Sequence, residues 1–374
     1  MNSVQLVHIA PELPPTVGGV ADYTAILSRR LVEVSDGAVD PVLVHAGRQP
    51  ADAIDVDVPV VDLSGQCSAS ALAETIGCHA REEEGQAVVV VEYAGYGYAK
   101  SGAPLWLLRG LRRARRSRTV SLITVFHELY AKSLRPWTRT FWTMPVQYFV
   151  ATRLARLSDG LTANWSRVAR WLSRRVDGTP VHLSPSFSNV GEPENLPPFA
   201  ERDPYAICFG GAGKKATLYE EYGPEVSRIL QKRGIERIID VGPDVPDEAV
   251  SSLTVPVESK GILPEQEVSV YLQNASLGLL NYELHCLRKS GVWGSYAAHG
   301  LPVLLAAERQ PIENLDEGKH FVLLGSGQIP EPEQLEAMSR AVRQWYDEVA
   351  HSRRAAQRML TILAAINKFE EKDE

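Results

Sequence analysis

The sequence predicts an α/β protein built from two doubly wound, Rossmann-like domains. Short apolar runs alternate with longer mixed segments, which is the pattern of parallel strands joined by helical crossovers. The chain has 374 residues, and a typical domain size of roughly 150 residues favours two domains. A segment rich in Pro, Ser, Asn and Glu at 184–203 interrupts the pattern, and a second series of strands and helices begins after it.

The first half of the chain predicts a domain at 1–190. Its apolar runs show little alternation of polar and apolar residues, as expected where helices cover both faces of a sheet. We expect strands at 4–10, 41–45, 87–92, 119–126 and 160–163. We expect helices at 20–34, 69–84, 104–116, 137–156 and 165–175.

The second half predicts a domain at 204–350, followed by a helix at 351–374 that packs back toward the first domain. Helical periodicity extends over 331–368, and two glycines and a proline mark its start. The strands expected here are 205–209, 237–241, 275–280 and 302–306. The other helices expected here are 264–273 and 291–299.

Composition excludes several classes of protein. A net charge of −7 argues against a nucleic-acid-binding protein, which needs a basic face to displace counterions from phosphates. No run approaches the roughly 20 apolar residues of a membrane span, and no secretory signal opens the chain, so a cytoplasmic location is expected. The cysteines have no paired spacing and are expected to be buried free thiols; they are Cys67, Cys78, Cys208 and Cys286.

One segment is strongly basic. Residues Arg109–Arg118 include six arginines in ten positions. This segment is either a solvated helix end or a contact with anionic lipid, which would place the protein at the inner face of the membrane.

Two glycines follow the first predicted strand directly. Gly18 and Gly19 stand between a proline-containing loop and the helix expected at 20–34. At the carboxyl end of a strand, such a pair lets a ligand approach the amides of a helix N-terminus, which favour negative charge. The alternative is a tight turn in which glycine supplies a positive φ. The pair lacks the spacing of a dinucleotide-binding fingerprint.

A histidine and a glutamate end another strand of the first domain. His127 and Glu128 follow the strand expected at 119–126, so the histidine is delivered to the same sheet edge as the two glycines. A catalytic histidine and a hydrogen-bonded structural histidine are both compatible with this position.

The second domain opens with another glycine-rich segment. Residues 210–217 read Gly-Gly-Ala-Gly-Lys-Lys-Ala-Thr. Gly211, Lys214 and Lys215 could cradle a diphosphate, or the segment could be a solvated turn. It is not a P-loop, because Lys215 stands where Ser or Thr would bind magnesium.

A further polar segment follows the strand expected at 275–280. Glu283 comes shortly after the strand, and Lys289, Ser290 and Gly291 open the next helix. A basic first turn with a serine cap and exposed amides suits a diphosphate, although serine caps helices in proteins of any function.

In order along the chain, these segments resemble the GT-B glycosyltransferases of family 4. The resemblance covers residues 1 to about 306. It rests on short motifs, which are Gly18, Gly19 and Val20 with Tyr23, the segment 158–166, the turn at Asp240–Pro243 that includes Gly242, Gly261 before a Pro-Glu-Gln-Glu helix start, and the segment 298–304.

The resemblance implies a GT-B fold, in which two Rossmann-like domains face a central cleft. It implies transfer of a sugar from a UDP- or GDP-linked donor in glycan, glycolipid or natural-product biosynthesis. Retention at the anomeric carbon, no required metal and no cofactor other than the substrate are also implied.

The resemblance assigns roles to individual residues. His127 would hydrogen-bond the donor sugar, and Lys214 or Lys215 would neutralise the leaving diphosphate. The other donor-side residues would be Gly18, Gly19, Gly211, Gly242, Glu283, Lys289, Ser290 and Gly291. The acceptor side would include Tyr23 and Glu128.

The chain departs from the family pattern at the donor-phosphate motif. Gly211 replaces the usual arginine, and the second glutamate of a two-glutamate motif falls on Ser295. These departures motivate an alternative, a non-catalytic GT-B relative that binds a nucleotide sugar or a protein. An epimerase or phosphorylase of this fold would need a carboxylate cluster or a phosphate site, and neither is evident.

Overall fold

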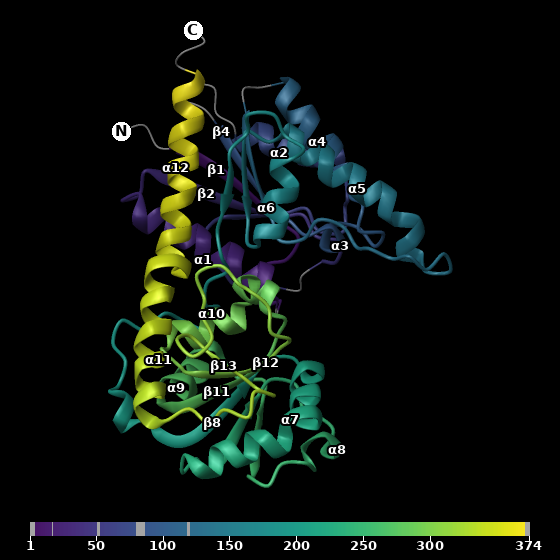
Figure 1. Ribbon diagram of the computed structural model, residues 1–374. Helices are drawn as coiled ribbons and strands as arrows, with labels where there is room; N and C mark the ends of the chain where they lie inside the picture. Colours follow the sequence, from purple (N-terminus) through teal and green to yellow (C-terminus); the bar gives the residue numbers. More distant parts are fainter. Residues whose placement is uncertain (1–3, 17, 51–52, 80–86, 118–119, 371–374) are drawn as a thin grey trace. The chain divides into compact units, whose positions relative to one another are not determined.

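The chain forms two compact α/β units. The computed structural model describes residues 4–16, 18–50, 53–79, 87–117 and 120–370. The first unit comprises Met1–Pro185 together with Ser352–Glu374, and the second comprises Ser186–His351. In each unit, helices cover both faces of one parallel sheet (Figure 1).

Among the described residues, the first unit has a seven-stranded parallel sheet in the order β3-β2-β1-β4-β5-β6-β7. Strand order therefore reverses between β1 and β4, as in a doubly wound sheet. In the register of these two strands, His8 lies opposite Val90. The strands are β1 (Val4–Ala10), β2 (Val39–His45), β3 (Val60–Asp62), β4 (Ala87–Tyr93), β5 (Val120–Phe126), β6 (Gly160–Ala163) and β7 (Val181–Leu183).

Alternate residues of these strands face two helical layers. Val7 and Ile9 pack in a core that includes Leu72 of α2 and Leu108 of α4, whereas His8 points to α1 on the other face. The C-terminal helix α12 lies beside α1 (Figure 1). The helices are α1 (Gly19–Val34), α2 (Ala69–His79), α3 (Gly95–Tyr98), α4 (Leu105–Ser117), α5 (Arg139–Leu157), α6 (Ser166–Ser173) and α12 (Ser352–Glu370).

The second unit has a six-stranded parallel sheet, within the described residues, in the order β10-β9-β8-β11-β12-β13. Its order reverses between β8 and β11. The strands are β8 (Asp203–Phe209), β9 (Arg237–Val241), β10 (Val257–Gly261), β11 (Ala275–Asn281), β12 (Val303–Ala306) and β13 (Val322–Leu323). The α-helices are α7 (Ala212–Lys232), α8 (Asp247–Val250), α9 (Glu265–Asn274), α10 (Gly291–Ala298) and α11 (Pro332–Trp345), joined by the 3₁₀ turns η1 (Phe199–Glu201) and η2 (Leu284–Lys289) and the π-helical turn η3 (Tyr346–Ala350).

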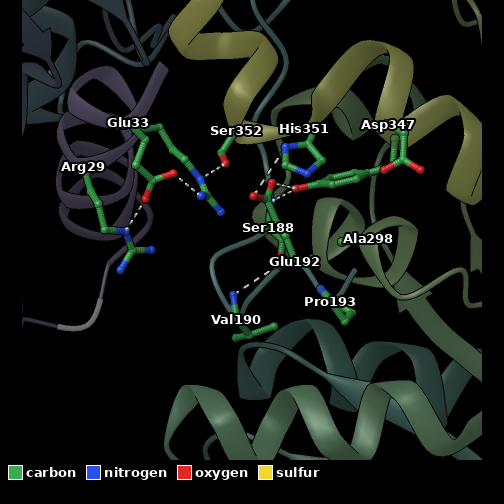
Figure 2. Close-up of polar contacts among 12 residues, drawn as sticks. Arg29, Glu33, Ser188, Val190, Glu192, Pro193, Ala298, Asp347, His351 and Ser352 are labelled. Atoms are coloured by element: carbon green, nitrogen blue, oxygen red, sulfur yellow. Dashed lines mark hydrogen bonds and ion pairs between the residues drawn. The ribbon is translucent and has the colours of Figure 1, made fainter. Parts of the chain in front are cut away.

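The chain passes from the second unit back to the first at His351 and Ser352, and polar contacts hold both sides of this crossing (Figure 2). In the second unit, the Glu192 carboxylate accepts a hydrogen bond from the Tyr346 hydroxyl and lies 3.5 Å from His351 Nδ1. In the first unit, Arg30 Nε donates to Ser352 Oγ at 2.9 Å. The C-terminal helix is thus tied by its first residue to α1.

Two expectations need correction, and one lies partly outside the described residues. The helix expected at 69–84 is present over Ala69–His79, and residues 80–84 lie outside the described residues, as do Arg118 and Thr119. The 21-residue helix α7 occupies a stretch that the sequence suggested only as a glycine-rich cradle or turn. The four cysteines are free, but Cys78 is exposed and Cys67 half-buried, so only Cys208 and Cys286 are buried thiols.

Every helix in the described part of the chain is too short or too polar to cross a bilayer.

Candidate functional site

The first unit brings two histidines and a glutamate together where its strand order reverses. His8 comes from β1, Glu92 from β4, and His127 follows β5 directly. His127 Nε2 lies 2.6 Å from Glu92 Oε2, and His8 Nε2 lies 2.8 Å from Glu92 Oε1. His8 and Glu92 are fully buried, whereas the His127 side chain remains 10% exposed. Only His127 of the three is therefore open to a ligand.

The hydrogen bonds assign the protons of this cluster. A carboxylate accepts hydrogen bonds only, so both histidines donate Nε2–H to Glu92. Burial alone would raise the pKa of Glu92, but the hydrogen bonds from His127 and His8 outweigh it and hold its pKa below the ordinary value. With its proton on Nε2, the neutral form of His127 presents Nδ1 as a hydrogen-bond acceptor, which suits a hydroxyl group of a ligand.

Tyr23 supports His127 from α1. The two rings meet edge to face with centroids 5.0 Å apart, and Tyr23 is only 6% exposed. Burial raises the pKa of Tyr23 well above its ordinary value, and its hydroxyl hydrogen-bonds Ser184. Tyr23 therefore holds His127 in place from the core, and its assignment to the acceptor side stays a prediction. Glu128 is exposed.

Gly18 and Gly19 begin α1 at the same sheet edge. Gly18 has an extended backbone with φ −178°, so the positive-φ turn considered as an alternative is not formed there. A Cβ on Gly18 would lie 3.0 Å from Glu12 Oε2, whereas one on Gly19 would meet nothing within 4 Å. Val17 lies outside the described residues. Among the described residues, nothing fills the space beside Gly19, which leaves room for a ligand at the start of α1.

In the second unit, the two adjacent lysines have different environments. Gly211 precedes α7, so Lys214 and Lys215 lie in its first turn, where consecutive side chains diverge by about 100°. Lys214 is exposed and Lys215 is 2% exposed. The expectation that both lysines could meet a diphosphate is corrected accordingly, because α7 turns Lys215 into the core.

Lys215 is part of a buried ion pair. Its Nζ donates to Asp240 Oδ1, and the Tyr219 hydroxyl donates to Asp240 Oδ2 at 2.6 Å. Gly242 follows this pair with φ +115°, and a Cβ there would lie 2.3 Å from the carbonyl oxygen of Gly210. The ends of β8 and β9 thus approach so closely that only glycine fits at 242. Gly242 therefore allows the backbone after β9 to pass close to Gly210.

A cavity of about 830 Å³ lies at the carboxyl ends of β8, β11 and β12. Its volume is in the usual range for small-molecule sites. Two expected donor-side residues, Lys214 and Glu283, line it together. The remaining lining residues are Gly213, Thr217, Glu221, Tyr222, Asn281, His285, Ala306, Ala307, Glu308 and Gln310. Ser295 is fully buried instead and bonds Asn189, so the position aligned with the second glutamate is not in this cavity.

Tyr282 connects the first turns of α7 and α10. The Lys214 ammonium lies over its ring, 5.7 Å from the centroid, and its hydroxyl hydrogen-bonds Ser290. Burial raises the pKa of Tyr282 to about 12. Ser290 Oγ also accepts the Trp293 amide at 3.2 Å and caps α10. The positive ends of two helix dipoles are therefore brought to one edge of the sheet.

The other residues expected around Ser290 are less exposed to solvent than Lys214. Lys289 is half-buried at the end of η2, and Gly291 opens α10 with Asn189 Oδ1 3.5 Å from where its Cβ would be. Arg288, which belongs to the same basic turn, is buried and pairs with Glu313 at 3.4 Å. Of the basic residues at this edge, Lys214 is thus the exposed one, Lys289 is half-buried and Arg288 is buried.

Three side chains near the cavity could hold a cation. Glu283, His285 and Cys286 place ligand atoms within 4.8 Å of one another, and this is the group of that kind found in the described residues. Glu283 Oε2 already lies 3.3 Å from His285 Nε2. His285 Nδ1 in turn bonds Gln310. These mutual contacts account for the grouping.

Sequence reasoning missed His8 and Glu92. A signal was present, since Glu92 is a carboxylate at the end of the apolar run Ala87–Tyr93, and buried charges need partners. Its partners are 84 and 35 residues away, so no local pattern could identify them.

No family model and no curated protein match the sequence. Solved structures do match over nearly the whole chain. A glycosyltransferase from Rickettsia africae has a TM-score of 0.64 at 11% identity, with 98% of this chain and all of that chain covered. Sucrose-phosphate synthase from Thermosynechococcus elongatus has a TM-score of 0.61 at 13% identity, with 98% and 99% covered. HepE of Anabaena, solved with UDP and glucose, has a TM-score of 0.60 at 11% identity, with 96% and 99% covered. The chain therefore has the GT-B fold of two Rossmann-like α/β domains, as the sequence predicted.

Proposed function

We propose that this protein is a glycosyltransferase that moves a sugar from a nucleoside diphosphate donor, linked to UDP or GDP, to an acceptor in glycan, glycolipid or natural-product biosynthesis. The observation that carries the proposal is the cavity in the second unit at the carboxyl ends of β8, β11 and β12, where the strand order reverses between β8 and β11. Ligands of open α/β sheets bind at such positions. Structures with the same fold include one solved with UDP and glucose.

The second unit supplies groups that suit each part of a nucleoside diphosphate. Lys214 and the N-termini of α7 and α10 offer positive charge to phosphates. Glu283 and Glu308 line the same cavity and can accept hydrogen bonds from ribose hydroxyls. We assign Lys214 to the diphosphate and Glu283 to the ribose. Lys215 lies in the core, where its ion pair with Asp240 joins α7 to the end of β9.

The proposed reaction retains anomeric configuration and uses no metal. Fixed positive charge at Lys214 and the helix N-termini would stabilise the leaving diphosphate, which is the role that a divalent cation has in other transferases. His127 would accept a hydrogen bond from a sugar hydroxyl through Nδ1, since Glu92 holds its Nε2–H. Transfer that persists after treatment with a chelator is the expected result, and full loss with recovery on added metal would contradict it.

Calorimetry tests the donor assignment without knowledge of the acceptor. The purified protein is titrated with UDP, GDP, TDP and ADP, alone and as nucleotide sugars. We expect one base to bind, and Lys214→Met to weaken that binding by at least about tenfold through loss of a charge-assisted contact. Lys232→Met, a change at the other end of α7, serves as the matched control. Silence of the wild-type protein across the set would overturn the donor site.

A non-catalytic GT-B relative is the second candidate. It is favoured by the burial of Lys215, which leaves one lysine exposed at the first turn of α7. The substitution His127→Ala distinguishes the two. Loss of sugar transfer with retained donor binding supports the enzyme, whereas a wild-type protein that binds a donor and shows no turnover with water or any acceptor supports the relative.

A further inference from the structure

Large apolar side chains are exposed on α5 and on the loop before it. In the loop, Leu134 is 95% and Trp137 80% exposed, and on the helix Trp142 is 71% and Phe149 45% exposed. Trp142 Nε1 donates to the Pro136 carbonyl at 2.7 Å, so the loop is tied to the first turn of the helix. Large apolar side chains exposed together on neighbouring segments mark an interaction site.

Five exposed residues of α5 form one stripe. Trp142, Val146, Phe149, Arg153 and Arg156 are exposed and follow one another at spacings of four and three residues, which places them on one face. The opposite face is buried and packs on the sheet; it contains Gln147, Val150, Ala151, Leu154 and Ala155. The apolar residues of the stripe therefore do not pack in the core, and they remain accessible to a binding partner. We call this stripe, with Leu134 and Trp137, the aromatic face.

The charge of this region is opposite to that of the chain. Residues 129–158 contain no aspartate or glutamate, in a protein of net charge −7. The stripe itself ends in two arginines, and the Arg153 guanidinium lies 5.3 Å from the Phe149 ring centroid. The basic residues of the region are Lys132, Arg135, Arg139, Arg153 and Arg156. A partner that matches this face must present an apolar region next to a negatively charged region.

We propose that the aromatic face docks on the surface of an anionic lipid bilayer. Tryptophan rings favour the boundary between headgroups and acyl chains, where they bury an apolar body and keep the N–H hydrated. Arginines beside them pair with lipid phosphates while their stems cover apolar surface. A bilayer offers both layers over the whole stripe. Vesicle binding is read without turnover, so this inference does not depend on the proposed glycosyl transfer.

This face is a better anchor than the arginine-rich helix α4. The arginines of α4 are mostly exposed, but its leucines Leu107, Leu108 and Leu111 are buried, and Arg115 is held by Asp159. Charge without an apolar anchor gives only weak membrane binding. In α5, Gln147 Oε1 accepts the Ala131 amide at 2.8 Å and its Nε2 donates to Ser101 at 2.7 Å, so the helix is pinned to the first unit.

Vesicle co-sedimentation of the full-length protein tests the proposal. Vesicles of phosphatidylcholine alone are compared with vesicles that also contain phosphatidylglycerol, at low and high salt. The wild-type protein is expected to bind the anionic vesicles and to be released by salt. The triple variant Trp137→Ala, Trp142→Ala, Phe149→Ala is expected to lose at least about tenfold in partition. Its control is Ile262→Ala with Val270→Ala, which removes apolar side chains that are 69% and 55% exposed in the second unit.

The arginines are tested separately. Arg153→Gln and Arg156→Gln are expected to cost about fivefold each in binding to anionic vesicles, and to leave unchanged any binding to phosphatidylcholine. Arg309→Gln with Arg340→Gln, on exposed surface of the second unit, is the control. The replaced side chains lie outside the core, so we expect the variants to fold. Thermal unfolding verifies this.

Three results would overturn the proposal. The first is no binding of the wild-type protein to anionic vesicles. The second is equal partition of the wild-type protein and the triple variant. The third is a wild-type dimer in sedimentation experiments that the triple variant converts to a monomer while vesicles have no effect, which would assign the face to a second copy of the chain.

Discussion

His127 Nε2 lies 2.6 Å from Glu92 Oε2. The other oxygen of this buried carboxylate is held by His8, whose Nδ1 lies 2.7 Å from Ser28 Oγ. The Glu92 carboxylate thus fixes the tautomer of His127, the one member of the cluster that is partly exposed. The residues that hold this carboxylate in place come from β1 and α1. The orientation of His127 is a property of the sheet rather than of its own loop.

Replacing Glu92 tests this dependence. In Glu92→Gln, the amide can accept from one histidine but must donate to the other, so one imidazole changes tautomer or loses its bond. We expect His127 to be the Nε2–H tautomer in the wild-type protein and a mixture in the variant, read by long-range ¹H–¹⁵N spectra of histidine-labelled protein. Stability should fall by about 1–3 kcal/mol because buried groups lose partners.

The exposed neighbour Glu128 provides the control for this experiment. Glu128→Gln should leave both the tautomer and the stability as they are, because its side chain is exposed. An Nδ1–H tautomer of His127 in the wild-type protein would contradict the assignment of the protons.

The two adjacent lysines in the first turn of α7 should separate effects on stability from effects on binding. Lys215→Met leaves Asp240 charged and buried, which costs roughly 3–5 kcal/mol, whereas Lys214→Met should change stability by less than about 0.5 kcal/mol. Urea unfolding gives both values. Adding Asp240→Asn to Lys215→Met should recover part of the loss, since the stranded charge is removed. A Lys215→Met protein as stable as wild type would disprove the ion pair.

The buried histidine of α10's C-terminus predicts a dependence of stability on pH. His299 Nδ1 donates to the Ser295 carbonyl at 2.7 Å, and its Nε2 lies 2.8 Å from Ser269 Oγ. Burial is the main cause that lowers the pKa of His299 to about 4. Between that value and the ordinary value near 6.5, the unfolded chain binds a proton that the folded chain excludes, so stability falls as pH decreases through this window.

The expected loss is about 3 kcal/mol between pH 6.5 and pH 4. Denaturant unfolding at several pH values measures it. His299→Gln, which cannot take up the proton, should flatten the curve by about that amount, and His182→Gln should do so much less because His182 is only partly buried. An unchanged slope in His299→Gln would show that the residue is protonated in the folded state.

Gly242 should tolerate no side chain. Its φ of +115° and the 2.3 Å approach to the Gly210 carbonyl mean that Gly242→Ala must displace backbone. We expect a loss of about 1–3 kcal/mol, measured by urea unfolding. Gly213→Ala is the control, because nothing lies within 4 Å of its Cβ position and alanine favours a helix. Equal stability of the two variants would contradict the close approach.

Much of the fold was accessible from local pattern. The segments Val4–Ala10, Arg237–Val241 and Gly160–Ala163 are strands with the predicted bounds, because a parallel strand covered on both faces is mostly apolar over a short stretch. The helix α7 was not identified, because glycines and a proline at 224 weaken its local signal. It forms nevertheless, since Leu218, Val226 and Leu230 are buried against the sheet of the second unit.

The amino-acid pattern alone thus determined the α/β class, the two sheets and the glycines and polar residues at strand ends, because these depend on periodicity within a few residues. Tertiary structure decided which of those residues act together. Strand order brings His8 to Glu92 across 84 positions of sequence. Helix α7 sends Lys214 outward and Lys215 inward, although the two are adjacent and chemically identical. Burial and hydrogen-bond partners depend on packing over the whole unit, and no local pattern encodes them.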